Sequence, residues 1–242
     1  MSTGFGAGSG FVMLRRTNRP MLLLIHFPLD PASRKVRILL KEKGIAFELR
    51  EERAWERREE FLALSPAGDL PVLIEADGKP IADVGAIVEY LEETGPGPSL
   101  YGTDPRARAE VRRLAAWFDR KFQREVTTNL LDEKIGRRIM GKGTPDSSAI
   151  RAGIVNLKTH LDYIAWLADR RTWLAGNDFS MADISAAAQL SCIDYLGDVP
   201  WDDHAGARDW YQRVKSRPSL RPLLGDRLPG APPPKHYADL DF

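Results

Sequence analysis

The first hundred residues alternate short apolar runs with one apolar stripe at helical spacing. The continuous run at 22–27 predicts a strand that is buried on both faces. Residues 33–44 place apolar side chains on one helical face, with Ser33 as the predicted N-cap and Gly44 as the end. Residues 45–50 form a second strand candidate. A strand, a helix and a strand in this order predict two parallel strands joined by a right-handed crossover.

A hairpin and a further helix follow in the same half. Residues 71–82 hold two short strands around a polar turn, and 83–93 have the pattern of a helix. Because proline has no amide hydrogen, Pro71 is expected at the head of its strand, after a cis peptide bond from Leu70. Such a bond would leave the Leu70 backbone unpaired and facing a cleft, where another extended backbone could dock.

The second half of the chain is predicted to be helical throughout. Apolar stripes cover 111–122 and 150–164, which indicates two long antiparallel helices. Ser180 and Asp183 form a capping box at the start of another helix, and a Gly- and Pro-rich stretch after position 94 marks a domain boundary. The predicted divisions are a disordered leader at 1–20, an α/β domain at 21–94, a linker at 95–104, an all-helical domain at 105–225 and a Pro-rich acidic-aromatic tail at 226–242.

Composition narrows the possible functions. The 242 residues are 43% hydrophobic and 29% charged, as in ordinary globular proteins. The 35 basic and 34 acidic residues nearly balance, which predicts neither a nucleic acid nor an anionic membrane as a partner. The single cysteine, Cys192, fits a cytoplasmic protein and is expected to be a small buried side chain. Four scattered histidines predict no metal site.

Local charge is concentrated on the first predicted helix. Its basic residues are expected to form a solvated face, with binding of an acidic ligand or peptide as the alternative. They are Arg34, Lys35, Arg37 and Lys41.

Two motifs together resemble one family. The hairpin headed by Pro71 leads into Asp83-Val84-Gly85-Ala86-Ile87, and the capping box reads Phe179-Ser180-Met181-Ala182-Asp183. In order and position both are similar to the glutathione transferase superfamily, and the resemblance covers about residues 21–225. It implies an α/β thioredoxin-like domain followed by an all-α helical domain, which is the glutathione transferase fold.

The resemblance also indicates which residues glutathione chemistry would require. Similar bacterial members have a Cys or Ser in the turn before the first helix, where this chain has Asp30, and Ser33 comes one turn later. A carboxylate cannot donate a hydrogen bond to a thiolate at neutral pH. The acidic residue that anchors glutathione is retained as Asp83, but the serine beside it is replaced by Val84. We therefore expect no catalytic residue and no cofactor, and a ligand-binding remnant made of Leu70, Pro71, Asp83 and Val84.

Two segments carry large side chains that a packed core does not explain. Trp55 stands in a highly charged stretch, where it either pins a loop to the body or serves as an exposed anchor. The tail alternates acidic and large apolar residues, which either fold back on the body or are offered to a partner. The candidate partner-binding residues are Trp55, Tyr237, Asp239, Leu240, Asp241 and Phe242.

These segments, with the turn at Asp30, resemble one bacterial branch of the superfamily. Members of that branch bind the tubulin-like division protein FtsZ and are not known for transferase activity. The resemblance implies a cytoplasmic homodimer at the division site, a non-catalytic adaptor that binds FtsZ filaments and modulates their curvature and bundling. The alternative is an active glutathione transferase that conjugates glutathione to electrophilic small molecules.

Overall fold

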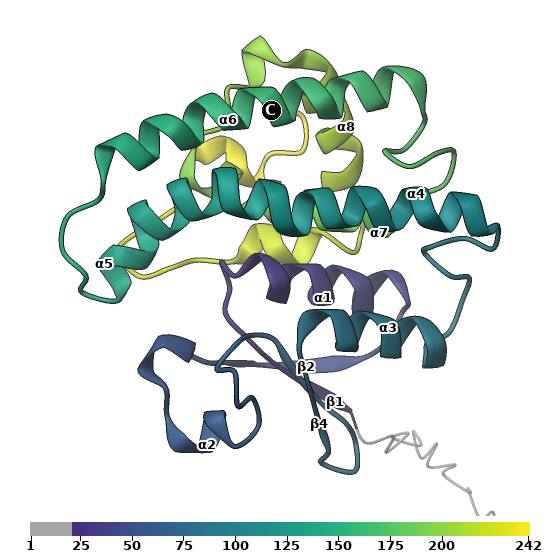
Figure 1. The fold of residues 1–242 in the computed structure, drawn as a ribbon, viewed down its shortest axis with the longest axis vertical. Coiled ribbons are helices and arrows are strands. Elements are labelled where there is room, and N and C mark those ends of the chain that lie inside the picture. Colours follow the sequence, from purple (N-terminus) through teal and green to yellow (C-terminus); the bar gives the residue numbers. More distant parts are fainter. Residues whose placement is uncertain (1–20) are drawn as a thin grey trace, which may run out of the picture.

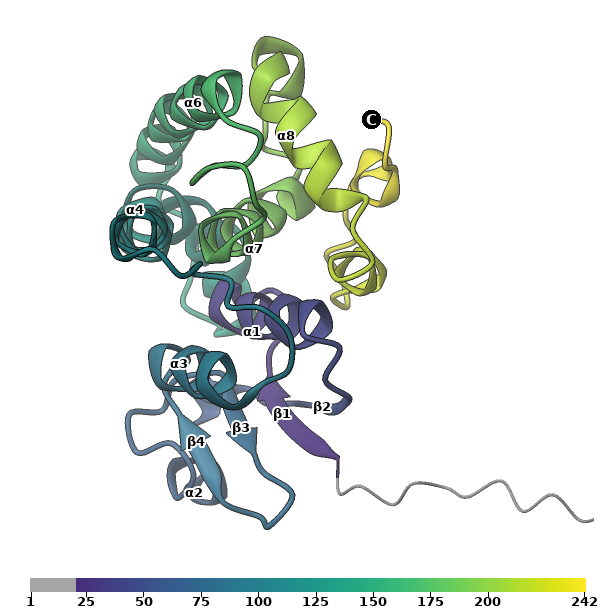
Figure 2. The same cartoon turned by 90° about the vertical axis from the view of Figure 1, so that its right-hand side faces the viewer.

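The computed structural model describes residues 21–242, and the predicted leader at 1–20 lies outside the described residues. A small sheet forms one end of the molecule and a group of helices forms the other (Figure 1). Helices α1 (Pro31–Glu42) and α3 (Val84–Thr94) lie between the sheet and the helical domain (Figure 2). No helix in the described part of the chain is long and apolar enough to cross a membrane.

The sheet has four strands in the order β2-β1-β3-β4. Strand β1 pairs in parallel with β2 and antiparallel with β3, and β3 pairs antiparallel with β4, so the predicted parallel pair and hairpin are confirmed. The remaining elements of this half are short. In chain order they are β1 (Leu22–His26), β2 (Phe47–Glu51), η1 (Ala54–Glu56), α2 (Glu59–Leu62), β3 (Val72–Ile74) and β4 (Pro80–Ala82).

The Leu70-Pro71 peptide bond at the head of β3 is cis, as predicted. Pro71 is buried, whereas Leu70 is half-buried. Within residues 21–242, the backbone amide of Leu70 has no hydrogen-bond partner. The predicted unpaired edge therefore exists in the described structure.

One long helical rod and three further helices build the second domain. The rod runs without a break from α4 through η2, whose amides bond five residues back, into α5, and it packs along α6. The central helix α7 is buried along nearly its whole length between the rod and α1. The elements are α4 (Pro105–Ala116), η2 (Trp117–Gly136), α5 (Arg137–Ile139), α6 (Ser147–Arg170), α7 (Met181–Leu196), η3 (Trp201–Asp203), α8 (Ala205–Lys215), η4 (Arg221–Gly225) and η5 (Lys235–Ala238).

The predicted capping box at the start of α7 is confirmed. The Ser180 amide donates to the Asp183 carboxylate at 3.1 Å, and the Ser180 hydroxyl accepts from the Ala182 amide. The other carboxylate oxygen of Asp183 accepts from the Leu174 amide and from the Trp210 indole, each at 3.0 Å. A buried carboxylate with this many donors fixes the centre of the helical domain.

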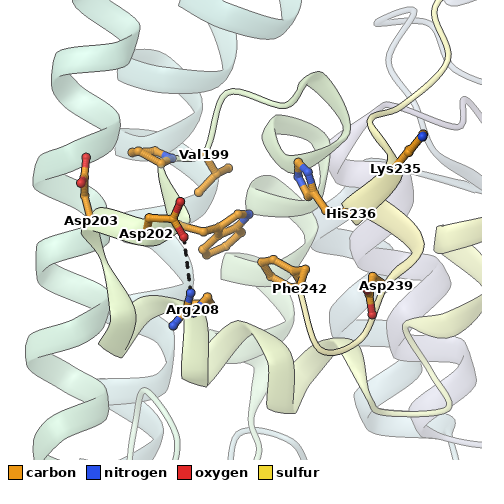
Figure 3. Close-up of a pocket in the computed structure, with 10 residues that line it drawn as sticks. Val199, Asp202, Asp203, Arg208, Lys235, His236, Asp239 and Phe242 are labelled. Carbon is orange, nitrogen blue, oxygen red and sulfur yellow. Dashed lines mark ion pairs between the residues drawn. The ribbon is translucent and has the colours of Figure 1, made fainter.

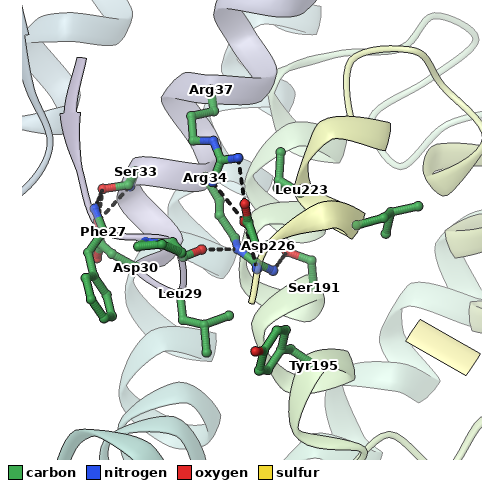
Figure 4. A network of polar contacts seen from close by, with 12 residues as sticks. Phe27, Leu29, Asp30, Ser33, Arg34, Arg37, Ser191, Tyr195, Leu223 and Asp226 are labelled. Atoms are coloured by element: carbon green, nitrogen blue, oxygen red, sulfur yellow. Dashed lines mark hydrogen bonds and ion pairs between the residues drawn. The ribbon is translucent and has the colours of Figure 1, made fainter. Parts of the chain in front are cut away.

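The basic face of α1 is buried, which corrects the prediction of a solvated face. Arg34, Lys35 and Arg37 are each less than 7% exposed, and only Lys41 is exposed. Arg37 forms a bidentate ion pair with Asp226, both distances being 2.9 Å, and Arg34 reaches the same carboxylate at 3.2 Å (Figure 4). Asp226 supplies the negative charge that balances these guanidinium groups, and these ion pairs hold α1 against the segment that starts the tail.

The tail folds back along α8, which decides between the two predicted alternatives for its conformation (Figure 2). The Tyr195 hydroxyl donates to the Ala231 carbonyl and accepts from the Leu228 amide, both at 2.8 Å. Gln212 donates to the Phe242 carbonyl at 2.9 Å, so the tail is attached at both ends.

Candidate functional site

A cleft of about 400 Å³ separates the sheet domain from the helical rod. The sheet domain contributes the turn before α1, the segment around Trp55 and the hairpin loops, and the rod contributes one face of η2 and α5. We call this space the interdomain cleft. Its lining residues are Phe27, Leu29, Asp30, Pro31, Ala54, Trp55, Gly68, Asp69, Leu70, Asp83, Val84, Gln123, Thr127, Leu131, Asp132, Ile135, Gly136, Ile139 and Met140.

Asp30 is the N-cap of α1, which corrects the assignment of that role to Ser33. Its carboxylate accepts from the Ser33 amide at 2.7 Å and from the Ser33 hydroxyl at 2.6 Å. Pro31 occupies the first helical turn, where its missing amide hydrogen costs nothing, and this places the cap one residue before it. Burial at this position raises the pKa of Asp30 to about 6, although the two Ser33 hydrogen bonds act in the opposite direction.

Ser33 is fully buried and does not line the interdomain cleft. Its hydroxyl donates to Asp30 and accepts from the Phe27 amide at 3.3 Å. The single hydroxyl proton is therefore used inside the protein and is not directed at the cleft.

The hairpin side of the cleft contains three of the four predicted remnant residues. Leu70, Asp83 and Val84 line it, while Pro71 is buried beside them. Asp83 has φ = 79°, a conformation that is rare for a residue with a side chain, and its carboxylate caps α3 by accepting from the Ala86 amide at 3.0 Å. The side chain of Val84 has no donor to offer.

Trp55 combines features of both predicted alternatives. Its indole packs edge-on against Phe27, with ring centroids 5.0 Å apart, and it is half-buried. The same side chain lines the interdomain cleft, so the loop is pinned while part of the ring stays accessible.

The wall of the cleft that the rod provides was not predicted from the sequence. Gln123, Thr127, Leu131, Ile135 and Ile139 follow one another at intervals of four residues on the same helical face. This spacing was a usable signal, but the stripe mixes polar and apolar residues and does not stand out as a core face.

A second pocket, of about 590 Å³, lies between the tail and the segment around η3 (Figure 3). Asp239 and Lys235 are exposed beside it, and Phe242 packs edge-on against Trp201 at its floor, with ring centroids 5.0 Å apart. Arg208 pairs with Asp202 at 3.6 Å on the opposite rim. We call this region the tail pocket.

The predicted contact role of Tyr237 needs a correction. Its side chain has no exposed surface, its hydroxyl donates to the Leu223 carbonyl at 3.0 Å, and its ring packs edge-on against Tyr195. Leu240 and Phe242 are half-buried against the helical core, whereas Asp239 and Asp241 are exposed. Burial of the aromatic residues keeps the tail in place, and the acidic residues face solvent.

Trp55 and the tail do not share a pocket, although they were predicted together as one set of partner-binding residues. Trp55 lines the interdomain cleft, whereas Asp239 and Phe242 of the tail line the tail pocket. Any partner that touches both has to contact both domains.

Two further titratable side chains, Cys192 and His160, are buried in the helical domain. Burial raises the pKa of Cys192 to about 12, so its thiol stays protonated. His160 accepts from the Trp117 indole at 3.0 Å and contacts Glu125. Within residues 21–242, no group of three or more His, Cys, Asp and Glu side chains is placed to hold a metal ion.

The protein joins a mixed four-stranded sheet with a cis-proline turn to a helical bundle around a capped central helix. This arrangement defines a two-domain glutathione transferase-like protein. Residues 24–99 match the glutathione S-transferase N-terminal domain, and residues 158–218 match the C-terminal domain. The chain belongs to the glutathione S-transferase family.

Among its relatives, FtsZ-localized protein A of Caulobacter vibrioides is 51% identical over 222 residues, which are 90% of this chain and 97% of that protein. The solved structure of FzlA from C. crescentus matches 92% of this chain and 100% of its own, with a TM-score of 0.89. A glutathione S-transferase from Rhodospirillum rubrum F11 is 58% identical, with the same coverage and a TM-score of 0.90.

Proposed function

We propose that this protein is an FtsZ-binding adaptor with a glutathione transferase fold, which modulates filament curvature and bundling without catalysing conjugation. The observation that carries the proposal is the 51% identity to FtsZ-localized protein A over almost the whole of both chains. By the same reasoning, the protein acts in the cytoplasm at the division site and as a homodimer.

The docked tail supports a role in partner binding. Buried rings and side-chain hydrogen bonds to backbone carbonyls hold the tail on α7, η4 and α8, so its exposed groups are presented from a fixed surface. Preorganised groups lose little conformational entropy when a partner binds. Asp239 and Asp241 then give this surface an acidic rim, beside a pocket large enough to receive a side chain of the partner.

The geometry around Asp30 supports the non-catalytic part of the proposal. A transferase needs a donor that stabilises the thiolate of glutathione near the start of α1. Here the carboxylate of Asp30 occupies that place, the hydroxyl of Ser33 is consumed by the same carboxylate, and Val84 provides no hydroxyl for the glutamyl end.

Co-pelleting with FtsZ tests the adaptor function. The protein is mixed with purified FtsZ and GTP, and GDP replaces GTP in the reference sample. We expect GTP-dependent pelleting, which Asp239→Lys weakens about tenfold because it reverses a charge at the proposed contact. Asp209→Lys, a charge reversal at an exposed position of α8 outside both pockets, is the matched control and should pellet like the wild type.

Trp55→Ala tests whether the interdomain cleft takes part in the same contact. Circular dichroism and the unfolding midpoint show whether the variants remain folded. Absence of GTP-dependent pelleting by the folded wild type would refute the adaptor function, and full binding by both variants would refute the contact assignment.

The second candidate function is glutathione conjugation, which the 58% identity to a glutathione S-transferase from Rhodospirillum rubrum favours. Retention on immobilised glutathione and turnover of 1-chloro-2,4-dinitrobenzene would show it. Such turnover would overturn the non-catalytic proposal, and its loss in Ser33→Ala would assign the chemistry to Ser33.

Light scattering tests the homodimer. A single chain has a mass of 27.1 kDa, so a dimer scatters as a particle of twice that mass. A particle of one chain at micromolar concentration would contradict the proposal.

A further inference from the structure

The interdomain cleft is lined by apolar and by acidic side chains, and both domains contribute to each kind. Its apolar lining includes the Phe27 and Trp55 pair on the sheet domain, and Ile135, Ile139 and Met140 on the rod. Ile139 and Met140 are each 38% exposed, although both are large and hydrophobic. Exposed apolar groups that surround a cavity are typical of a ligand site rather than of a solvated surface.

The charged groups of the cleft all have the same sign. Four carboxylates line it, from Asp30, Asp69, Asp83 and Asp132, and no Lys, Arg or His side chain does so in the described part of the chain. Arg57 lies next to Gly68. Burial raises the pKa of Asp132, and the charge of Lys142 acts to lower it. Neither basic side chain lines the interdomain cleft.

Two of these carboxylates come from opposite walls. Asp30 stands at the start of α1 and Asp132 on the rod, and the negative charge of Asp132 contributes to raising the pKa of Asp30. Like charges that face one another across a cavity destabilise each other, and a cation between them removes that cost.

The composition of the cleft restricts the chemistry of its occupant. An anionic ligand such as glutathione would add negative charge to four carboxylates. A metal ion requires converging ligands, and residues 21–242 contain no group of three or more side chains in such a geometry. An aromatic pair beside carboxylates suits an organic ammonium or guanidinium group, which binds through cation–π and charge-assisted contacts.

We propose that the interdomain cleft binds a small organic cation with an apolar body. The cationic group lies between Asp30 and Asp132, and the apolar body rests against Trp55 and the Ile135 to Met140 wall. This inference goes beyond the adaptor function and does not depend on FtsZ, because it rests on the lining of the cleft and not on a contact with a partner protein.

Three probes of nearly equal size test the proposal on the full chain. They are 4-phenylbutylammonium, which is cationic, 4-phenylbutanol, which is neutral, and 5-phenylvalerate, which is anionic. Isothermal titration measures their affinities, and the ¹⁵N indole resonance of Trp55, assigned with Trp55→Phe, shows whether each probe reaches the cleft. We expect the cation to bind tightest and the anion weakest, and the affinity for the cation to fall as salt is added.

A pair of variants separates a specific site from general charge attraction. Asp132→Asn removes an exposed carboxylate of the cleft that caps no helix, so the fold should persist. It should lower the affinity for the cationic probe about tenfold and leave the affinity for the neutral probe unchanged. Asp209→Asn, which removes an equal charge outside the cleft, should leave both affinities unchanged.

Three results would overturn the proposal. They are no shift of the Trp55 indole with the cationic probe, binding of the anionic probe at least as tight as the cationic one, and equal effects of Asp132→Asn and Asp209→Asn. Because FtsZ is absent from these titrations, they fail or succeed independently of co-pelleting.

Discussion

The ammonium group of Lys215 lies 3.9 Å from the ring centroid of Phe242, at the point where the tail meets α8. Lys215 is fully buried, donates to the His236 carbonyl at 3.0 Å, and lies 3.7 Å from the Asp194 carboxylate. The rings of Tyr211 and Tyr237 complete its surroundings, each about 6 Å away. The tail is therefore held around a buried cation.

Phe242→Ala should release the end of the tail. The substitution removes the ring that contacts Lys215, Trp201 and Tyr211, with an expected loss of about 1–3 kcal/mol of tail docking. Hydrogen exchange should rise in residues 235–242 while α7 stays protected. Asp241→Ala is the control, because the Asp241 side chain is exposed and makes no contact that holds the tail. Unchanged exchange in Phe242→Ala would contradict this account.

Asp226→Asn should destabilise the contact between α1 and the start of the tail. Its carboxylate receives the guanidinium groups of Arg34 and Arg37, which are at most 3% exposed (Figure 4). Removing one partner of a buried ion pair leaves uncompensated charge, so the expected loss in free energy of unfolding is about 3–5 kcal/mol.

Urea unfolding measures the effect of Asp226→Asn. Asp169→Asn breaks the exposed pair with Arg170 and should change stability by less than about 0.5 kcal/mol. Similar losses in the two variants would mean that the buried network contributes no more than a surface ion pair.

Much of the fold could be predicted from the sequence, because the signals were local. The strand at 22–27, the proline at 71 and the capping box at Ser180 depend on residues within a few positions of one another. The basic face of α1 was misassigned because its partner, Asp226, lies 192 residues from Arg34 in sequence. Periodicity along one helix cannot reveal such a partner.

The candidate site was predictable only in part, for a similar reason. Asp30 and Val84, the two residues that differ from those expected in a glutathione site, stand in recognisable local motifs. The charge and shape of the interdomain cleft depend on Asp132 and on the wall around Ile135, which the fold brings to the sheet domain from a hundred residues away. The separation of Trp55 from the tail also depends on tertiary structure, so the sequence could not show that they lie at different pockets.

His26 should make the protein sensitive to acid. Burial lowers its pKa to about 4 and the nearby Arg37 acts in the same direction, whereas the unfolded chain has a pKa near 6.5. Because the folded state binds this proton more weakly, the contribution to stability is complete above pH 6.5 and is lost as the pH falls towards 4. Asp30 acts in the opposite sense: its raised pKa favours the folded state below pH 3.8, and that contribution is lost as the pH rises through about 6.

Comparison with His26→Gln isolates the histidine, because both proteins retain Asp30. Between pH 7.5 and 4.5, the wild type should lose about 2–3 kcal/mol more unfolding free energy than the variant. Urea denaturation at a series of pH values gives both curves. Parallel curves would show that His26 does not carry the acid sensitivity.

Gly153 lets α6 approach the helical rod closely. A Cβ atom at this position would lie 2.8 Å from Cγ of Leu130 and 2.9 Å from Cβ of Asn129, which is shorter than van der Waals contact. Alanine favours a helix over glycine by about 1 kcal/mol, but here the two helices would have to move apart. We expect Gly153→Ala to destabilise the protein by a net loss of about 1–3 kcal/mol, which is typical of overpacking.

Gly136→Ala provides the matched comparison on the rod itself. Its added Cβ would lie 3.5 Å from Cβ of Asp132, an ordinary contact, and its backbone is helical. Helix propensity alone should then stabilise this variant by about 0.5–1 kcal/mol. Opposite signs of the two changes in urea unfolding are the expected result. Stabilisation by Gly153→Ala would mean that α6 and the rod are not closely packed at this point, because the same gain in helix propensity applies to both positions.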